Sequence, residues 1–275
     1  RSADLEPLFW KAGRLVDVID KAARFSTVTL TTSGDQFWND ERQTLDGDAL
    51  TILRLCRNMY INVPAVEEAS FALQVKGPSG WMHTRQVLTS LVEHNRVHSE
   101  PRCKLYGVVV VTSFNVSQIA NIDSTLMSIG LDGIYYKQYK EFEGRNVAKI
   151  RLGDRTMAAR LEEIPIAQRS SPLSEFIASL SIEYSETCEC WMNRTGHNAV
   201  VDPNGDIFLC TPTVGKPEHC IGNLDSGGFS ACWTGELRRV ALRQLSALSR
   251  GGLCPRECRE HVNNRLIDQQ IRQRQ

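Results

Sequence analysis

Long apolar runs and a charge excess of either sign are both absent from this sequence. It contains no stretch of about 18 consecutive apolar residues, the length that lets a helix span a bilayer. Its 32 Lys and Arg residues equal its 32 Asp and Glu residues. A balanced chain has no overall electrostatic attraction to nucleic acid or to an anionic membrane surface. We therefore expect neither a nucleic-acid partner nor a membrane partner.

We also expect no secretion signal at the start of this sequence. The first residues, RSADLEPLFWK, lack the apolar core that a signal peptide needs. We expect the protein to be cytoplasmic. Because the first residue is Arg rather than Met, we also expect the sequence to be a fragment or a processed chain.

Cysteine is scarce in the first 187 residues, where only Cys56 and Cys103 occur. The other seven cysteines all lie between residues 188 and 258. Clustered cysteines in a long chain without a secretion signal are more typical of metal binding in a reducing compartment than of a disulfide framework. The C-terminal region is therefore the candidate metal-binding region.

The first half of the sequence alternates strand and helix patterns. Runs rich in β-branched, apolar or aromatic residues predict strands within residues 26–34, 58–66, 104–115 and 131–139. Apolar residues at helical spacing predict helices at residues 8–25, 83–95 and 116–130. Strands that alternate with helices through short connections indicate βα units around a parallel sheet, open or barrel-like.

The pattern changes near residue 165. Ser and Pro residues interrupt the segment from 145 to 187, and one helix is predicted from Leu173. Beyond Cys188 the chain reads as a hairpin, an irregular loop and a helix. We predict two domains, residues 1–165 and residues 166–275, in an α/β protein whose C-terminal domain is a small α+β unit.

The stretch AVVDPNGDIFLC, residues 199–210, predicts a β-hairpin. Pro203 presets the turn, and Gly205 supplies the positive φ that such turns require. Cys190 precedes the first strand and Cys210 ends the second.

A later helix is predicted to begin near Phe229 or Trp233 and to end at Gly251-Gly252. Cys254 and Cys258 follow at once, so the hairpin and the helix end would bring four thiols together. Four thiolates can bind Zn²⁺ or an iron–sulfur cluster. Spacing alone does not choose the metal, because zinc patterns typically have two close CxxC pairs and this sequence has one close and one wide pair. Disulfides or unligated thiols remain alternatives.

Residues 190–258 resemble the SPASM/twitch extension of radical S-adenosylmethionine (SAM) enzymes. That extension has a cysteine, a hairpin of the form DP(D/N)GD ending in cysteine, a GN segment, a helix near a Trp and a closing cysteine pair. This sequence reads C…AVVDPNGDIFLC…IGNLDSGGFSACW…CPREC. One hairpin and one closing pair look more like the twitch form, which has a single auxiliary 4Fe–4S cluster. The resemblance implies that the cluster ligands are Cys190, Cys210, Cys254 and Cys258.

Three further cysteines lie in the same region. Cys188 competes with Cys190 for the ligand position, and Cys220 and Cys232 have no assigned role.

The first 165 residues resemble the barrel of the same enzymes, which implies a partial (β/α)6 radical-SAM barrel. The segment DLEPLF resembles the GGEP segment at the end of the second barrel strand. Glu6 would there accept hydrogen bonds from the amino group of SAM, a sensible pairing of carboxylate and ammonium. The segments TLTTSG, INVPAV and VVVVTSFN resemble later strand ends. This implies further SAM-binding positions at Thr32, Ser33, Gly34, Asn62 and Asn115.

The family's CxxxCxxC motif, which holds the radical-generating cluster, occurs nowhere in this sequence. The match begins at the second barrel strand, so at least one strand–helix unit, on the order of 30 residues, is missing. We therefore expect the N-terminal truncation of a longer enzyme. The intact enzyme would hold a second 4Fe–4S cluster and SAM, and the fragment alone would be inactive.

For the intact enzyme, the resemblance implies reductive cleavage of SAM to a 5′-deoxyadenosyl radical that abstracts a substrate hydrogen. Ligation of the auxiliary cluster by four thiolates favours electron transfer over substrate coordination. The expected activity is that of a radical SAM oxidoreductase or peptide maturase. The expected partners are a peptide or small-molecule substrate and a reductant such as flavodoxin or ferredoxin.

Two other hypotheses stay open. The four thiols could hold zinc in a non-catalytic α/β binding module. Alternatively, the chain could be a degenerate family member that acts as a protein partner.

Overall fold

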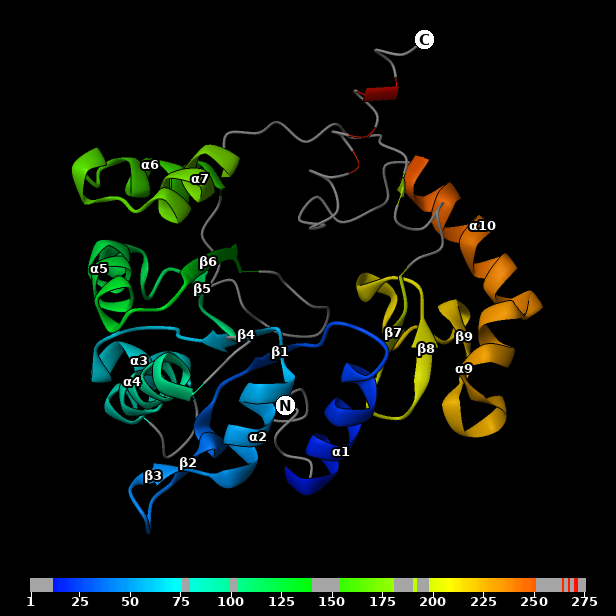
Figure 1. The fold of residues 1–275 in the computed structure, drawn as a ribbon. Coiled ribbons are helices and arrows are strands. Elements are labelled where there is room, and N and C mark those ends of the chain that lie inside the picture. The colour runs from blue at the N-terminus through cyan, green and yellow to red at the C-terminus, as the bar shows by residue number, and fades with distance from the viewer. Residues whose placement is uncertain are drawn as a thin grey trace. The chain divides into compact units, whose positions relative to one another are not determined.

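Two compact units make up the chain, Arg1–Ile182 and Glu183–Gln275 (Figure 1). The computed structural model describes residues 12–75, 80–98, 103–139, 154–180, 190–191 and 198–250, together with residues 264, 267, 270 and 271. Among these residues, no helix combines the length and the apolar character needed to cross a membrane.

Four parallel strands form the main sheet of the first unit. In spatial order they are β1 (Thr29–Thr32), β4 (Asn58–Asn62), β5 (Lys104–Val111) and β6 (Gly133–Gln138). The strands are joined through α2 (Gly47–Leu55), α3 (Glu68–Gln74), α4 (Trp81–His98) and α5 (Ile119–Ile129). Spatial order follows chain order, which confirms the predicted α/β fold built from βα units. The carboxyl ends of all four strands therefore lie at one edge of the sheet.

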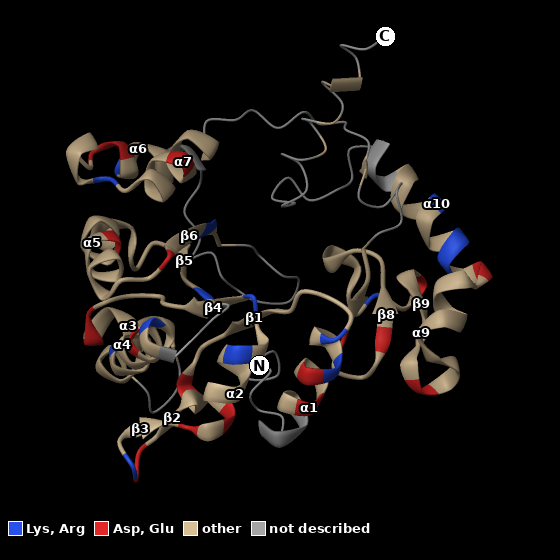
Figure 2. Cartoon of the chain, viewed as in Figure 1, with Lys and Arg blue, Asp and Glu red and all other residues tan. Residues whose placement is uncertain are grey.

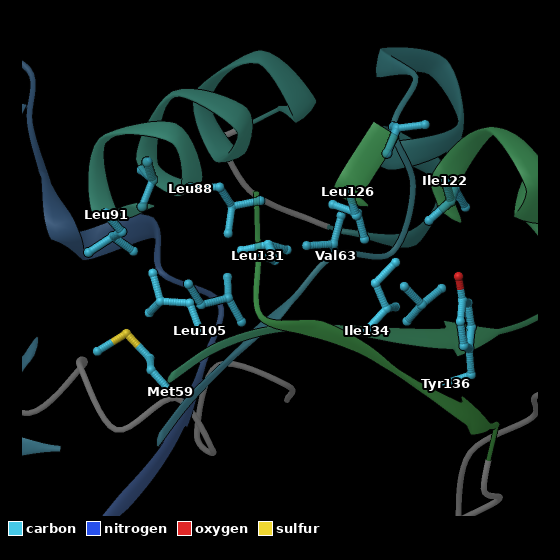
Figure 3. Close-up of a cluster of buried hydrophobic side chains, with 14 of the residues drawn as sticks. Met59, Val63, Leu88, Leu91, Leu105, Ile122, Leu126, Leu131, Ile134 and Tyr136 are labelled. Carbon is cyan, nitrogen blue, oxygen red and sulfur yellow. The ribbon is translucent and has the colours of Figure 1, made fainter. Parts of the chain in front are cut away.

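Helices cover one face of this sheet (Figure 1). On that face, alternate strand residues point into the core, as the two-residue period of a strand requires. Figure 3 shows Met59 of β4 and Leu105 of β5 near Leu88 and Leu91 of α4, and Leu126 of α5 beside Val63, which follows β4. All six side chains are fully buried. Burial of each such side chain contributes about 1.5–3 kcal/mol, so these contacts hold the sheet against its helices.

The start of α2 and the end of α5 are each determined by a single capping residue. Asp46 caps α2 by accepting a hydrogen bond from the Asp48 backbone N–H at 2.8 Å. Gly130 ends α5 with a φ of 93°, and its N–H donates to the Met127 carbonyl at 3.1 Å. The left-handed conformation favours glycine at this place, so the predicted stop at Gly130 is confirmed.

The remaining elements of the first unit are short. α1 (Ala12–Ala23) packs beside α2 through the buried Leu15 and Ile19. β2 (Trp38–Asn39) and β3 (Thr44–Leu45) form a small antiparallel pair. α6 (Asp154–Glu162) and α7 (Ser171–Leu180) follow β6. The helix predicted from Leu173 is α7, whereas α6 was not predicted.

A buried carboxylate joins α5, β6 and the start of α7. The Tyr136 hydroxyl donates to Asp123 Oδ1 at 2.5 Å, and the Ser170 hydroxyl donates to the same oxygen at 2.7 Å. The Ser170 N–H donates to Asp123 Oδ2 at 3.0 Å. The Tyr136 ring contacts Phe176 of α7 with centroids 5.7 Å apart. These contacts hold the beginning of α7 against the sheet.

Residues 198–250, the main described part of the second unit, form a three-stranded antiparallel sheet and two helices. The strands are β7 (Val200–Val201), β8 (Asp206–Phe208) and β9 (Cys220–Asn223). The helices are α9 (Leu224–Thr234), which kinks at Gly228 with φ 72°, and α10 (Glu236–Arg250). Its small core consists of Ile207, Leu209, Ile221, Cys232, Ala241 and Leu245.

The predicted hairpin at residues 199–210 is confirmed as β7 and β8. Asp202 Oδ1 accepts hydrogen bonds from the N–H groups of Asn204 and Asp206, both at 2.9 Å, and Gly205 has a φ of 83°. The Asn223 amide then donates to the Asn204 carbonyl at 2.9 Å and to Asp206 Oδ1 at 2.8 Å. The turn is therefore tied to the third strand, β9, which was not predicted.

The prediction of one helix beginning near Phe229 or Trp233 was wrong in detail. The chain forms a helix from Leu224 and a second from Glu236, separated at Gly235. The Asn223 side chain caps the first helix by accepting from the Asp225 N–H at 2.8 Å, which moves the helix start toward the N-terminus.

The chain is divided into the two compact units between Ile182 and Glu183, and α6 and α7 pack within the first of them. The domain boundary predicted near residue 165 would place α7 in the second domain. The division into compact units does not show which residues belong to which functional domain, so the boundary near residue 165 stays a prediction.

Replacing Tyr136 by Phe should lower the free energy of unfolding by about 1–3 kcal/mol, because the buried Asp123 carboxylate loses one donor. Chemical denaturation measures this change. The matched control is Tyr135→Phe on the same strand, where the side chain is 52% exposed and the change should stay within about 0.5 kcal/mol. Equal stabilities for the two variants would contradict the role given to this hydrogen bond.

Candidate functional site

The carboxyl edge of the parallel sheet is the first candidate site. At the end of β1, the Thr32 hydroxyl accepts a hydrogen bond from the Gly34 N–H at 3.0 Å, and Thr32 is 1% exposed. Gly34 has a φ of 80°, and a Cβ placed there would lie 3.4 Å from Ile61 Cγ2. Glycine is thus favoured both by its backbone and by the close approach of β4.

The next strand end presents a polar group to solvent. Asn62, the last residue of β4, is exposed. Its backbone neighbour Val63 donates to the Val108 carbonyl of β5 at 2.8 Å, so the strand end is held in the sheet while the Asn62 side chain is left available for a ligand.

Asn115, after β5, is fully buried and acts as a clamp. Its amide nitrogen donates to the carbonyls of Pro64 and Val110, both at 2.8 Å. Its side-chain oxygen accepts the Thr112 N–H at 2.8 Å. Because Pro64 follows β4 and Val110 belongs to β5, this one side chain connects the loops at two strand ends.

A second set of polar side chains strengthens the same connection. The Gln74 amide of α3 donates to the Pro64 carbonyl at 3.0 Å and its oxygen accepts from the Thr112 hydroxyl at 3.0 Å. Gln118 donates to Glu67 Oε2 at 2.9 Å and to Ser70 Oγ at 2.7 Å. The loops after β4 and β5 are therefore joined by two groups of hydrogen bonds. We call residues Pro64, Gln74, Thr112 and Asn115 the loop clamp.

The predicted SAM-binding positions lie at this edge as far as the structure describes them. Thr32, Ser33 and Gly34 end β1, Asn62 ends β4, and Asn115 follows β5. Glu6 lies outside the described residues. Contact of any of these residues with SAM stays a prediction, and the hydrogen bonds of Asn115 give it the geometry of a positioning residue. Gln74 and Thr112 were not singled out from the sequence, where an amide and a hydroxyl on separate segments carry no signal.

The thiols of the second unit form the other candidate site. Cys210 ends the predicted hairpin, is half-buried and packs against the small core. Its carbonyl accepts from the Thr213 N–H at 3.0 Å and from the Thr213 hydroxyl at 2.7 Å. The neighbouring Leu209 carbonyl accepts from the Asn198 amide at 3.0 Å. The backbone on both sides of the thiol is thus held in place.

Cys190 is 8% exposed, and a contact beside it involves the end of the chain. The N–H of the next residue, Trp191, donates to the side-chain oxygen of Asn264 at 2.9 Å, and Asn264 is 3% exposed. Asn264 follows Cys258 by six positions in the sequence. The Trp191–Asn264 contact therefore places a residue from the segment after the closing cysteine pair next to the residue that follows Cys190, and a cluster shared by these cysteines stays a prediction.

The rest of the predicted ligand set is not described. Cys254, Cys258 and Cys188 lie outside the described residues. Among the residues that are described, no three His, Cys, Asp or Glu side chains gather as a metal site. Cys190 and Cys210 each carry a thiol, a donor type that suits an iron–sulfur cluster and zinc alike.

Cys220 and Cys232 have packing roles in the second unit. The Cys220 thiol donates to the Gly222 carbonyl at 3.3 Å, and the Cys232 thiol donates to the Asn223 carbonyl at 3.7 Å. A Cβ at Gly222 would lie 2.4 Å from the Cys232 sulfur, so a larger residue there would displace this thiol. Both thiols are engaged within β9 and α9.

Burial keeps the thiols of Cys56 and Cys103 from acting as metal ligands. Burial raises the pKa of Cys56 from 9.0 to about 11. Burial, together with the charges of Cys56 and Asp132, raises the pKa of Cys103 from 9.0 to about 12. Both remain protonated thiols at neutral pH, whereas metals bind the thiolate.

Comparison with known protein families gives one match, which covers the C-terminal region. Residues 169–259 match the family SPASM, described as an iron–sulfur cluster-binding domain. The SPASM domain expected from the cysteine pattern is therefore confirmed. No curated protein matches the chain.

Solved structures share the fold of the whole chain. Streptococcus suis SuiB aligns with a TM-score of 0.59 and 16% identity, covering 96% of this chain and 62% of SuiB. SuiB bound to S-adenosylmethionine gives a TM-score of 0.56 at 16% identity, covering 96% of this chain and 61% of that one. SuiB bound to the precursor peptide SuiA gives 0.56 at 17% identity, with 96% and 60% covered. This chain thus spans less than two thirds of SuiB and shares its fold over that length.

Replacing Asn115 by Ala should lower the free energy of unfolding by about 2 kcal/mol or more, because the buried Thr112 N–H and Val110 carbonyl lose their side-chain partner. Chemical denaturation at neutral pH measures it. Asn62→Ala is the matched control, since that side chain is exposed, and should change stability by less than about 0.5 kcal/mol. An Asn115→Ala variant as stable as the control would contradict the loop clamp.

Alkaline pH should destabilise the first unit through Cys56 and Cys103. Above pH 9 their thiols ionise in the unfolded chain but stay protonated in the folded one, until about pH 11 to 12. The unfolded state then binds fewer protons, so the free energy of unfolding falls as pH rises through this window. Urea denaturation between neutral pH and pH 11 measures the slope.

The double variant Cys56→Ala, Cys103→Ala is the control for this slope. It should be less stable at neutral pH because two buried side chains become smaller, but its stability should fall less steeply above pH 9. Parallel slopes for the two proteins would show that other groups cause the alkaline loss.

Proposed function

We propose that this chain, whose residues 169–259 form an iron–sulfur cluster-binding SPASM domain, is part of a radical SAM enzyme that modifies a peptide. The observation that carries the proposal is the combination of that domain with a parallel α/β unit in one chain with the SuiB fold. SuiB has been solved bound to S-adenosylmethionine and bound to the precursor peptide SuiA. Because this chain spans less than two thirds of SuiB, its cofactor and substrate are both part of the proposal.

The carboxyl edge of the sheet would hold SAM. In parallel α/β proteins this edge is where ligands bind, because the loops after the strands converge there. Asn62 presents an amide to solvent, and the turn at Ser33 and Gly34 lets the backbone approach a ligand closely. Glu6 would pair with the amino group of the cofactor. The loop clamp would fix the shape of the loops after β4 and β5 without contacting SAM.

Cys190, Cys210, Cys254 and Cys258 would hold one auxiliary 4Fe–4S cluster. When SAM and a further 4Fe–4S cluster are bound in such enzymes, they supply a carbon radical that abstracts hydrogen. The auxiliary cluster, with its four irons all ligated by protein, suits electron transfer better than substrate binding. The hydrogen bonds around Cys210 would hold its sulfur and shape the immediate surroundings of the cluster.

A reductant such as flavodoxin or ferredoxin would supply electrons, and a cytoplasmic location would keep the thiols reduced. The choice between a peptide and a small molecule as substrate rests on the SuiA complex of SuiB.

The second candidate is a zinc-stabilised module without radical chemistry. It rests on the equal suitability of thiolates for zinc. A degenerate family member acting as a protein partner is the remaining alternative.

Anaerobic reconstitution with iron and sulfide tests the proposal. We expect about four irons per chain with thiolate-to-iron absorption, and loss of most of this iron in Cys210→Ala. Cys220→Ser is the matched control. It keeps a hydroxyl donor for the Gly222 carbonyl and should retain iron as the wild-type chain does.

Tight stoichiometric zinc with no retained iron would instead support the zinc module. Iron retained equally by Cys210→Ala and Cys220→Ser would show that the assigned thiols are not the ligands.

A further inference from the structure

The carboxylate of Glu67 lies at the carboxyl edge of the main sheet. Glu67 ends the loop after β4, directly before α3, and is exposed to solvent. Its side chain makes no capping hydrogen bond to α3. The neighbouring Glu68 carboxylate accepts the N–H groups of Trp81 and Met82 at the start of α4, at 3.1 and 2.7 Å. Of these two acidic residues where α3 begins, coloured red in Figure 2, only Glu68 therefore caps a helix.

A side chain from the loop after the next strand fixes the position of the Glu67 carboxylate. Gln118 ends the short 3-10 helix Val116–Gln118 after β5, and its Nε2 donates to Glu67 Oε2 at 2.9 Å. The same nitrogen donates to Oγ of the buried Ser70 at 2.7 Å. The Gln118 backbone N–H donates to the Asn115 carbonyl at 2.9 Å, so Gln118 is itself tied to the loop clamp. Loops from two strand ends therefore hold this carboxylate in one orientation.

The surroundings of Glu67 are short of hydrogen-bond donors. Both hydrogens of Gln118 Nε2 are used, one by Glu67 and one by Ser70. The oxygen of the same amide, Gln118 Oε1, is buried and has no hydrogen-bond partner in the described part of the chain. Within that part, Glu67 makes no ion pair with a Lys or Arg residue either. A buried acceptor without a donor is unfavourable, so the two side chains together favour a ligand that brings donors.

An ammonium group meets this requirement better than a metal ion or a guanidinium group does. It carries three N–H donors and a positive charge, and it forms charge-assisted hydrogen bonds to a carboxylate. Metal ions that bind oxygen need about six ligands, and among the described residues no three His, Cys, Asp or Glu side chains gather as a metal site. A guanidinium group bonds best to both oxygens of a carboxylate, and Glu67 Oε2 already accepts from Gln118.

We propose that Glu67, oriented by Gln118, binds an ammonium group of the peptide substrate, supplied by a lysine side chain or by the amino terminus. The word substrate rests on the proposed function, whereas the binding of an ammonium group rests on Glu67 and Gln118 alone. In parallel α/β proteins, ligands bind at the carboxyl edge of the sheet. The exposed Asn62, at the end of β4, lies at the same edge. Glu67 thereby fixes one point of the peptide at the edge where SAM is proposed to bind.

An NMR titration of the full chain, loaded with iron and sulfide, tests this inference with a pentapeptide that has lysine at its centre and glycine or serine elsewhere. The side-chain amide signal of Gln118 reports on the site, and Gln118→Ala assigns that signal by removing it. We expect the signal to shift until it saturates in the millimolar range of peptide. Glu67→Gln should weaken binding about tenfold, because the charged partner of the ammonium group is lost. Added salt should weaken binding to the wild-type chain.

Glu41→Gln, in the exposed turn between β2 and β3, is the matched control and should bind the peptide as the wild type does. Peptides acetylated at the lysine or at the amino terminus identify which of the two supplies the ammonium group. A peptide acetylated at both places should not bind. An equal shift with this doubly acetylated peptide, no shift with any peptide, or equal affinities for Glu67→Gln and Glu41→Gln would each overturn the inference.

SAM also carries an ammonium group, so it is titrated separately. We expect Glu67→Gln to bind SAM as the wild-type chain does. A tenfold loss of SAM affinity in this variant would assign Glu67 to the cofactor and overturn its assignment to the substrate.

The iron content of the same samples separates the two proposals. Binding of the ammonium group without iron would leave the Glu67 site standing and reject the proposed function. Iron without such binding would do the reverse.

Discussion

Parallel strand pairing is the constraint on which the first unit depends. When β1, β4, β5 and β6 run in the same direction, their carboxyl ends must meet at one edge. Residues far apart in sequence, such as Gly34, Asn62 and Asn115, then lie at one edge of the sheet. The Asn115 side-chain amide fixes the shape of that edge, because it donates hydrogen bonds to the Pro64 carbonyl after β4 and to the Val110 carbonyl within β5. A ligand there would meet a prearranged surface, and little binding energy would be lost in ordering loops.

A second constraint shapes the cysteine-bearing unit. The Asp202–Gly205 turn and the Asn223 side chain fasten the hairpin to β9, and Cys210 stands at the end of that hairpin. Trp191 and Asn264 join the beginning and the end of the unit. Among the described residues of this unit, six form the core cluster, and bound metal would add folding free energy because it binds the folded state alone. Cluster binding and folding of this unit are therefore expected to support each other.

Local signals predicted much of this structure. β-branched runs predicted the four parallel strands, Gly130 predicted a helix end, and DPNG predicted the hairpin, since each depends on residues close in sequence. What escaped prediction depends on distant partners. The loop clamp joins Gln74 to Thr112 across 38 positions, and the rings of Tyr60, Tyr106 and Tyr135 meet only because they fall on one face of adjacent strands. Such groupings depend on the register between paired strands, which cannot be derived from the sequence of any one strand.

The assignment of four cysteines to one iron–sulfur cluster is the central claim. Quantitative alkylation with mass spectrometry, before and after iron and sulfide are loaded, tests it cysteine by cysteine. The account predicts that iron protects Cys190, Cys210, Cys254 and Cys258, while Cys220 and Cys232 react alike in both states. Cys56 and Cys103 should react slowly in both, because they are buried with raised pKa values. Protection of a different set, or no difference between the two states, would contradict the account.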